Sequence, residues 1–136
     1  MHLHNREQIF ADRAKLIARL GFGGMMIPHG YSKLMKLFAP GDISFADPIW
    51  LGPDISLYLT IFAELVCAVL LIVGFKTRWA VIPPIITMMV AAFIVHGNDP
   101  WGKKEFALLY LVGYMVIMLL GPGKYSLDHY LNSRKR

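Results

Sequence analysis

Apolar residues along this chain gather into three long runs that are separated by short polar segments. The runs cover residues 55–75, 79–96 and 105–121. Each run is close to the length of about 20 residues that an α-helix needs to cross the hydrocarbon core of a bilayer. Glycine, proline and charged residues bound the runs in the segments "LGPD", "GFKTR", "HGNDPWGKK" and "GPGK", and these residue types commonly end helices. The pattern therefore predicts three membrane-spanning helices.

A fourth helix is predicted over residues 16–38, although this stretch is less uniformly apolar. Its polar residues lie on one stripe, because they recur at alternating steps of three and four residues. Glycines on the other faces allow a neighbouring helix to approach closely. Pro28 is expected to kink the helix beside His29, because proline releases the carbonyl of Gly24 from its hydrogen bond. The stripe comprises Arg19, Phe22, Met26, His29, Lys33 and Lys36.

Composition indicates that lipid surrounds these helices. Of the 136 residues, 56% are apolar and 17% are charged, whereas roughly a quarter of the residues in a soluble domain are charged. The formal charge of +5 does not indicate a nucleic-acid partner, because the charges lie between apolar runs and not on one folded face. We therefore expect a single all-α domain over residues 1–136, a bundle of four transmembrane helices.

The distribution of charge predicts the orientation of this bundle. With four spans, one side carries ten basic and three acidic residues, and the other side carries four basic and five acidic residues. Loops on the cytoplasmic side of a membrane are enriched in lysine and arginine. Both termini are therefore expected in the cytoplasm. A chain with three spans would place the amino terminus opposite the basic tail and lose this agreement.

One carboxylate, Glu64, lies well inside an apolar run. A charge at that depth is costly unless it faces the interior of the bundle or a partner. His29 and Glu64 each lie nine residues from the expected outer end of their helix, about 13 Å at the helical rise, so we expect them at one depth. Lys33 is one turn above His29. Glu64 is expected either to face His29 or Lys33 or to remain protonated.

These polar residues form the candidate site. His96 and Glu105 are expected at its outer mouth, so the candidate ligand-binding residues are His29, Lys33, Glu64, His96 and Glu105. Glu64 and His29 are the candidates for a catalytic role, since a carboxyl group or an imidazole can donate a proton to a bound molecule. A second interpretation is a buried polar pair that fixes helix pairing without any chemistry.

No intrinsic cofactor or metal site is expected. The single cysteine, Cys67, lies in an apolar run, where a thiol behaves as a small hydrophobic side chain. A haem held by His29 and His96 is disfavoured, because the two are expected at depths that differ by a helical turn or more. Tyr110 and Tyr114 are expected in the core or along a groove and not as catalytic groups.

The segment after the last run predicts a short helix at the membrane interface. Gly121 and Gly123 permit a sharp exit from the last span. Ser126 is placed to cap a helix that continues through Leu131. The basic residues at 134–136 are expected to lie against anionic headgroups.

Taken together, these segments resemble the DoxX family of small bacterial membrane proteins. The resemblance implies a four-helix, multi-pass protein of the bacterial cytoplasmic (inner) membrane. Members and relatives are linked to the membrane subunit of a thiosulfate:quinone oxidoreductase and to complexes with soluble redox or sulfurtransferase enzymes, but no catalytic residue set carries over. The matching segments are Arg19 with Gly21, "HGYSK" at 29–33, Glu64 followed by "LLIVGFKTRWA" at 70–80, Glu105 with "FALLYL", and "GPGKYSLD" at 121–128.

Two functions fit these residues, and in both the chain contacts membrane lipids. The first is a membrane subunit of a quinone- or sulfur/thiol-linked redox system, in which His29 or Glu64 donates protons to a bound quinone and Lys33 stabilises the developing anion. Electron carriers would then come from a soluble or membrane partner subunit. The alternative is a noncatalytic scaffold, assembly factor or small-molecule or lipid carrier, because no complete catalytic constellation is present. An ion channel fits less well unless a homo-oligomer completes a polar path.

Overall fold

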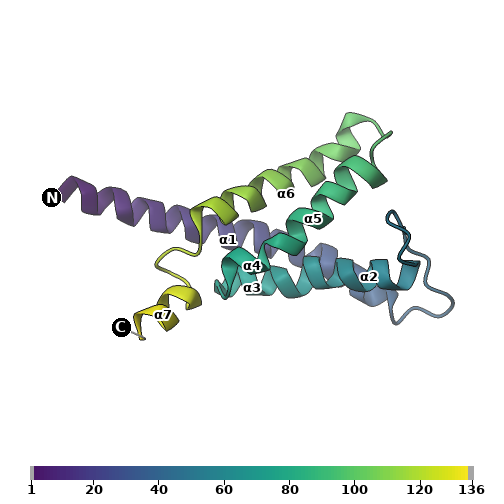
Figure 1. Ribbon diagram of the computed structural model, residues 1–136, viewed down its shortest axis with the longest axis horizontal. Helices are drawn as coiled ribbons and strands as arrows, with labels where there is room; N and C mark the ends of the chain where they lie inside the picture. The colour runs from purple at the N-terminus through teal and green to yellow at the C-terminus, as the bar shows by residue number, and fades with distance from the viewer. Residues whose placement is uncertain (1, 135–136) are drawn as a thin grey trace.

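The computed structural model describes the backbone of residues 2–134 and the side chains of residues 5–134, so Lys135 and Arg136 of the predicted basic tail lie outside it. Within this part of the chain every regular element is a helix, which confirms the all-α prediction (Figure 1). The label η denotes a π-helical turn. The elements are α1 (His2–Lys36), α2 (Pro53–Ile61), η1 (Phe62–Val66), α3 (Cys67–Val73), α4 (Thr77–Ala80), α5 (Ile82–Val90), η2 (Ala91–Val95), α6 (Trp101–Leu120) and α7 (Leu127–Ser133).

Within the part of the chain that the structure describes, two helical stretches are long and apolar enough to cross a membrane. They are Pro53–Val73, which joins α2, η1 and α3, and Thr77–Val95, which joins α4, α5 and η2. Pro83 and Pro84 lie in the first turn of α5, where the missing N–H of proline costs no helical hydrogen bond. The predicted spans at 16–38 and 105–121 are helical too, but charged residues interrupt the apolar pattern of α1 and of the first turns of α6.

The first helix is longer than the sequence pattern predicts. α1 begins at His2 and not near residue 16, and it continues through Pro28 to Lys36. Residues 5–15 contain no proline or glycine, and they include several good helix formers, which explains the earlier start. This first part of α1 projects beyond the other helices (Figure 1).

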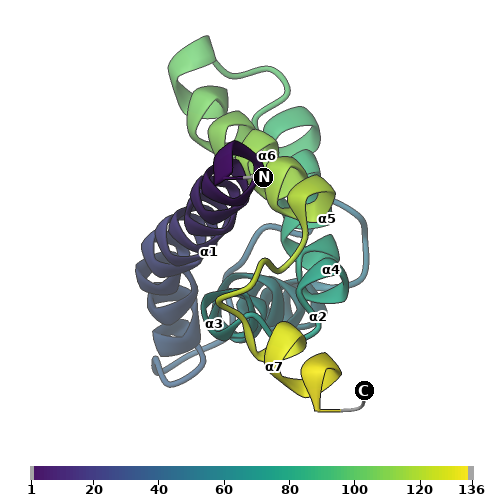
Figure 2. The ribbon, with the colours of Figure 1, turned by 90° about the vertical axis from the view of Figure 1, so that its left-hand side faces the viewer.

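The helices converge at the end that carries both termini and separate at the other end. Viewed from the termini, α1 lies on the left and α4 and α5 on the right, with α6 above and α3 below (Figure 2). α1 packs mainly on α3 and η1, and α5 packs mainly on α6. At the far end, α2 and α5 diverge (Figure 1). The buried core includes Met26, Ala68, Leu71, Val81, Ala92, Tyr114 and Ile117.

Large apolar side chains also cover the outside of the bundle. They include Phe62, Phe93, Leu109, Val112 and Leu119, each of which is exposed. Monomeric soluble proteins rarely expose apolar surface on this scale. The outer faces of these helices therefore suit an apolar solvent such as lipid.

Close contact between α1 and η1 depends on one glycine. A Cβ atom added to Gly30 would lie only 2.7 Å from the carbonyl carbon and oxygen of Glu64. Gly23 allows a similar approach to α3, whereas a Cβ atom on Gly21 or Gly24 would meet nothing within 4 Å. The expectation that glycines let a neighbouring helix approach α1 is thus confirmed for Gly23 and Gly30.

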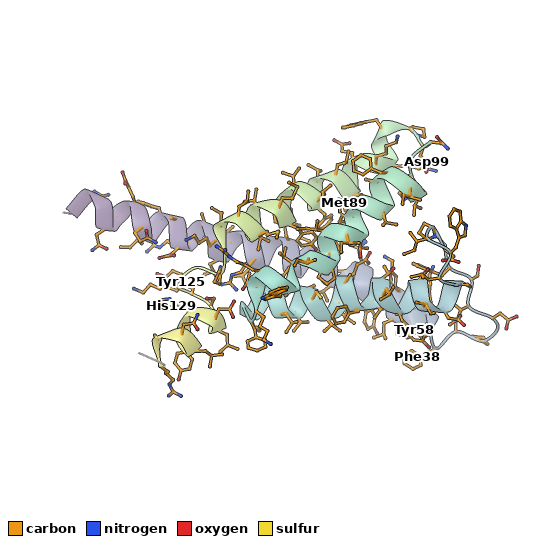
Figure 3. The ribbon with its side chains drawn as sticks, viewed as in Figure 1. Phe38, Tyr58, Met89, Asp99, Tyr125 and His129 are labelled. Carbon is orange, nitrogen blue, oxygen red and sulfur yellow. The ribbon has the colours of Figure 1, made fainter. Side chains whose placement is uncertain are left out.

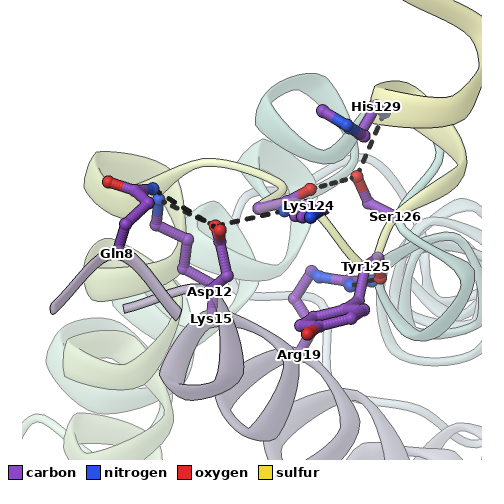
Figure 4. Close-up of polar contacts among 9 residues, drawn as sticks. Gln8, Asp12, Lys15, Arg19, Lys124, Tyr125, Ser126 and His129 are labelled. Atoms are coloured by element: carbon purple, nitrogen blue, oxygen red, sulfur yellow. Dashed lines mark hydrogen bonds and ion pairs between the residues drawn. The ribbon is translucent and has the colours of Figure 1, made fainter. Parts of the chain in front are cut away.

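At the terminal end of the bundle, Arg19 joins α1 to α3 and to the tail (Figure 4). Its side chain is fully buried, and Nη1 donates hydrogen bonds to the carbonyls of Leu71 and Ile72, both at 3.0 Å. Nη2 donates to the carbonyl of Tyr125. Carbonyls in the last turn of a helix lack partners within that helix. Arg19 therefore caps α3 from the side and holds the tail against it.

The tail supplies two further caps. Ser126 Oγ accepts a hydrogen bond from the N–H of His129 at 3.1 Å, which confirms the predicted cap of α7. The carboxylate of Asp128 accepts from the N–H of Lys76 at 2.7 Å and of Thr77 at 2.9 Å. Asp128 therefore caps α4, and the tail ties the start of α4 to the end of α6.

The chain leaves α6 sharply, as the sequence predicts. Gly121 and Gly123 have φ angles of 72° and 74°, in the left-handed region that favours glycine. The following N–H, of Lys124, donates to the carboxylate of Asp12 on α1 at 3.2 Å. Lys15 lies 3.7 Å from the same carboxylate oxygen (Figure 4). The exit turn is thereby held along α1.

Replacing Gly30 with alanine is expected to destabilise the bundle by about 1–3 kcal/mol, because the new methyl group would push α1 away from the backbone of η1. Gly24→Ala is the matched control on the same helix and should leave stability unchanged or raise it by up to about 1 kcal/mol, because alanine favours a helix more than glycine does. Unfolding of the purified chain in mild detergent measures both. Equal stabilities for the two variants would contradict the close approach at Gly30.

Arg19→Lys should destabilise the bundle by about 1–3 kcal/mol, because a single ammonium cannot replace the fork of donors that reaches the backbone carbonyls of both α3 and the tail. Arg13→Lys, at an exposed position of α1, serves as the control. Detergent unfolding and the rate of proteolysis within residues 121–134 report the effect. A tail that stays as protected in Arg19→Lys as in the parent would disprove the capping role.

Candidate functional site

A cavity of about 330 Å³ lies between α2, the loop of residues 37–52, and α5 with η2. Most of its wall is apolar. Its polar side chains come from Lys33, Ser56, Thr60, Glu64, Thr87 and His96. Small-molecule sites in proteins are typically apolar cavities of this order of size with a few placed polar groups.

Lys33 and Glu64 form an ion pair at this cavity. Lys33 Nζ lies 2.5 Å from Glu64 Oε2, and the two side chains are 23% and 6% exposed. Of the two basic partners that the sequence suggests for Glu64, Lys33 makes the contact. Because the pair is largely buried, removal of either side chain would leave an uncompensated charge.

Two π-helical turns position the polar residues of the cavity. In η1, which contains Glu64, the N–H of Cys67 donates to the carbonyl of Phe62, five residues earlier. At the end of η2, the N–H of His96 donates to the carbonyl of Ala91 at 2.9 Å. Single π-helical turns within α-helices occur often at functional sites. Their presence beside Glu64 and His96 marks this region as the candidate site.

Glu64 also borders a second hollow of about 140 Å³, which lies toward α6. Glu64 and His96 line both hollows, and so does Ala91. His29, Lys103 and Tyr110 add polar atoms to the second one. The two hollows therefore meet at Glu64 and His96.

His29 reaches the second hollow but takes no part in the ion pair. Its ring packs against Phe106, with 5.8 Å between the ring centroids, and against Tyr110 at 6.1 Å. Tyr114, one turn further along α6, is fully buried in the core. The expectation that these two tyrosines line a groove or lie in the core is confirmed.

His96 contacts Asp99, which also pairs with Lys103, at the end of the bundle away from the termini. Its Nδ1 lies 2.8 Å from Asp99 Oδ2, and both side chains are 35% exposed. Lys103 Nζ lies 3.7 Å from the same oxygen. The hydrogen bond with His96 lowers the pKa of Asp99, and the positive charge of Lys103 adds to this effect. Asp99 is therefore a carboxylate at neutral pH.

Glu105 borders neither of these hollows, although the sequence analysis places it at the mouth. The α6 residues that line the second hollow are Lys103, Phe106, Ala107 and Tyr110. They recur at steps of three and four, so they share one helical face. Glu105 falls off this face and is exposed. Among the described residues, no group of three His, Cys, Asp or Glu side chains is arranged to hold a metal ion.

The sequence analysis missed Asp47, which holds the 37–52 loop over the larger cavity. Its carboxylate accepts hydrogen bonds from the N–H groups of Leu51 and Gly52 and from Ser56 Oγ, each at 2.9 Å. The apolar residues beside it, from Phe45 to Ile49, form part of the cavity wall. An aspartate before proline and close to a helix start is a turn signal that identifies such an anchor.

The pKa of Asp47 provides a test of this anchor. Burial raises this pKa, but the three hydrogen bonds outweigh burial and leave it below the ordinary value. The charged form therefore stabilises the loop above the ordinary pKa, and this contribution is lost as the pH falls through the lowered value. We expect hydrogen exchange of the loop amides, corrected for its intrinsic pH dependence, to accelerate below about pH 4.

Asp47→Asn should accelerate the same exchange near neutral pH and remove most of its acid dependence. Asp42→Asn, an exposed residue of the same loop, is the control and should behave as the parent. Loop amides that exchange equally in the parent and in Asp47→Asn would show that Asp47 does not anchor the loop.

Comparison with known proteins gives one result. A family model with the description DoxX matches residues 14–97, which is more than half of the chain and includes α1 from its middle, Glu64 and His96. No curated protein and no solved structure matches the chain.

Proposed function

The chain belongs to the DoxX family, and we propose that it binds a quinone, or a similar amphipathic molecule, as the membrane subunit of a quinone- or sulfur/thiol-linked redox system. The observation that carries this proposal is the Lys33–Glu64 ion pair on a mostly apolar cavity of about 330 Å³. A quinone head is an apolar ring with carbonyl oxygens, so it needs both an apolar wall and a donor. The cavity offers both.

The proposal places four helices across the bacterial inner membrane, with both termini in the cytoplasm. In support, both termini lie at one end of the bundle (Figure 1). Tryptophan favours the two interfaces of a bilayer. Trp79 lies toward the end with the termini and is 75% exposed, whereas Trp50 and Trp101 lie toward the other end and are 91% and 65% exposed. In this arrangement α1 and α6 complete the bundle and the cavity lies in the outer half.

In the proposed reaction a quinone takes up two electrons and two protons and becomes a quinol. The electrons come from a partner subunit that carries a redox cofactor. Negative charge develops on the quinone oxygens as the electrons arrive, and the ammonium of Lys33 stabilises it through a charge-assisted hydrogen bond. Glu64 holds that ammonium in place as a carboxylate. After Lys33 has given a proton to the quinone, Glu64 takes up a proton from water and passes it to the neutral amine of Lys33, which restores the ion pair. This assigns the proton-donating role to Lys33 with Glu64, and not to His29.

The alternative function, a noncatalytic scaffold or lipid carrier, also has an observation in its favour. The ion pair joins α1 to η1, and Arg19 joins α1 to α3. Both contacts stabilise helix pairing without any bound molecule. Mass spectrometry of lipids extracted from the purified protein separates the functions. A stoichiometric quinone favours the redox subunit, and phospholipid alone favours the scaffold or carrier.

Lys33→Met is expected to weaken quinone binding roughly tenfold or more, because a hydrogen bond to a charged group contributes about 1.5–3 kcal/mol. Binding of a short-chain ubiquinone analogue to the chain in lipid nanodiscs is measured by quenching of tryptophan fluorescence. Glu64→Gln should also weaken binding, since the ammonium is no longer held. Lys124→Met, which removes an exposed lysine that lines neither hollow, is the matched control. Unchanged affinity in Lys33→Met, or no binding by the parent chain, would reject the quinone site.

A further inference from the structure

His96 connects both hollows to the end of the bundle that lies away from the termini. Its neighbour Asp99 lies at that end, far from Tyr125 and His129 at the other (Figure 3). The side chain of His96 lines both hollows and is 35% exposed. Among the described residues, Glu64 and His96 are thus the two ionisable residues that line both hollows.

The contact with Asp99 orients the imidazole. Because the carboxylate accepts a hydrogen bond at Nδ1, the neutral ring carries its proton there and leaves Nε2 free to accept another. Lys103 contacts the same oxygen of Asp99 and favours its charged form. A histidine held by a carboxylate in this way is suited to accept and release protons.

The route from Glu64 toward the termini is closed by packed apolar groups. Met26, Ala68 and Leu71 fill the core on that side, each 2% exposed or less, and the buried hydroxyl of Tyr114 beside them has no hydrogen-bond partner among the described residues. Beyond them, the guanidinium of Arg19 is hydrogen-bonded to backbone carbonyls. Among the described residues, no chain of hydrogen-bonded side chains therefore joins Glu64 to the end of the bundle that carries the termini.

The hollow between His96 and Glu64 is large enough to hold water. A water molecule occupies about 30 Å³ in the liquid, and the smaller hollow alone has a volume of about 140 Å³. Polar atoms of His29, Lys103 and Tyr110 add hydrogen-bonding partners there. His96 and Glu64 need no direct contact if water joins them.

We propose that His96, oriented by Asp99, carries protons between the aqueous phase at the end away from the termini and the carboxylate of Glu64. Nε2 accepts a proton from water, and the imidazolium then releases one proton through the hollow to Glu64. The ring returns to its neutral form, and one proton has moved without any oxidation or reduction. The inference rests on the proposed function for the use of these protons, since two such cycles supply the two protons of quinone reduction.

His29 is the competing carrier, because it borders the same small hollow. No hydrogen-bond partner orients its ring among the described residues, and the ring instead packs against aromatic side chains. The charged and titratable groups that face His96 across the two hollows and at the bundle end are Lys33 and His29 of α1, Glu64 of η1, Asp99, and Lys103 and Tyr110 of α6.

The experiment follows protonation of Glu64 directly and needs no quinone. The full chain is reconstituted in lipid nanodiscs, the pH is lowered rapidly, and the rise of the carboxylic acid C=O infrared band is recorded. The part of the band that disappears in Glu64→Gln belongs to Glu64. We expect His96→Gln to slow this rise roughly 100-fold, the size of a typical acid–base contribution, without changing its final amplitude.

Further variants separate proton transfer from a structural role. Free imidazole should restore the rate in His96→Gly, and Asp99→Asn should slow the rise less than His96→Gln does. His129→Gln, at an exposed position near the termini, is the control and should keep the parent rate within about twofold.

Several results would overturn the inference. The inference is wrong if the infrared band of Glu64 rises as fast in His96→Gln as in the parent chain, or if His29→Gln slows this rise and His96→Gln does not. It is also wrong if imidazole fails to restore the rate in His96→Gly, or if Glu64 takes up no proton in the parent chain. If Glu64 is protonated as fast in His96→Gln as in the parent chain, and the parent chain binds quinone, only the proton route through His96 is overturned. Loss of quinone binding with a His96-dependent rise would overturn only the proposed function.

Discussion

The contact between the backbone of α1 and the π-helical turn η1 determines the geometry of the site. Gly30 allows α1 to lie against the carbonyl group of Glu64. Lys33, one turn further along α1, then reaches the Glu64 carboxylate at 2.5 Å. A larger residue at position 30 would separate the two helices and leave a carboxylate in an apolar interior without its cation, which is a costly arrangement. Both the ion pair in the cavity and the pairing of α1 with η1 thus depend on the close approach of Gly30 to the backbone of Glu64.

The two ends of the bundle have different roles because their polar groups are used differently. At the terminal end, Arg19, Asp12, Ser126 and Asp128 are hydrogen-bonded to backbone groups, and they join α1, α3, α4 and the tail. Several hydrogen bonds that join different helices in this way favour rigidity. At the other end, α2 and α5 diverge, and the space between them is closed by a loop that Asp47 anchors. The terminal end, where the helices converge and are capped, therefore holds the helices together, while the other end leaves room for the cavity.

The proposed redox role and the proposed proton route share one residue, Glu64, but they place different demands on it. As the partner of Lys33, Glu64 must be charged so that it holds the ammonium toward the cavity. As the acceptor of protons from His96, it must take up a proton for a short time. Its position between two hollows meets both demands, because the larger hollow presents Lys33 and both hollows present His96.

The sequence by itself determined the helical elements and their local chemistry. Apolar runs and the spacing of polar residues located four helices, and Ser126 located the cap of α7, because these signals act over a few residues. An isolated carboxylate in an apolar run also identified Glu64, and residue spacing brought Lys33 within reach of it.

Only the tertiary structure decided which side chains meet. The π-helical turns have no composition signal, yet they position Glu64 and His96. Arg19 fell on a polar stripe in the sequence but caps α3, and Glu105 lies off the helical face that lines the second hollow. Such contacts depend on helix rotation and on the depth at which helices pack, and these depend on distant residues and not on local pattern.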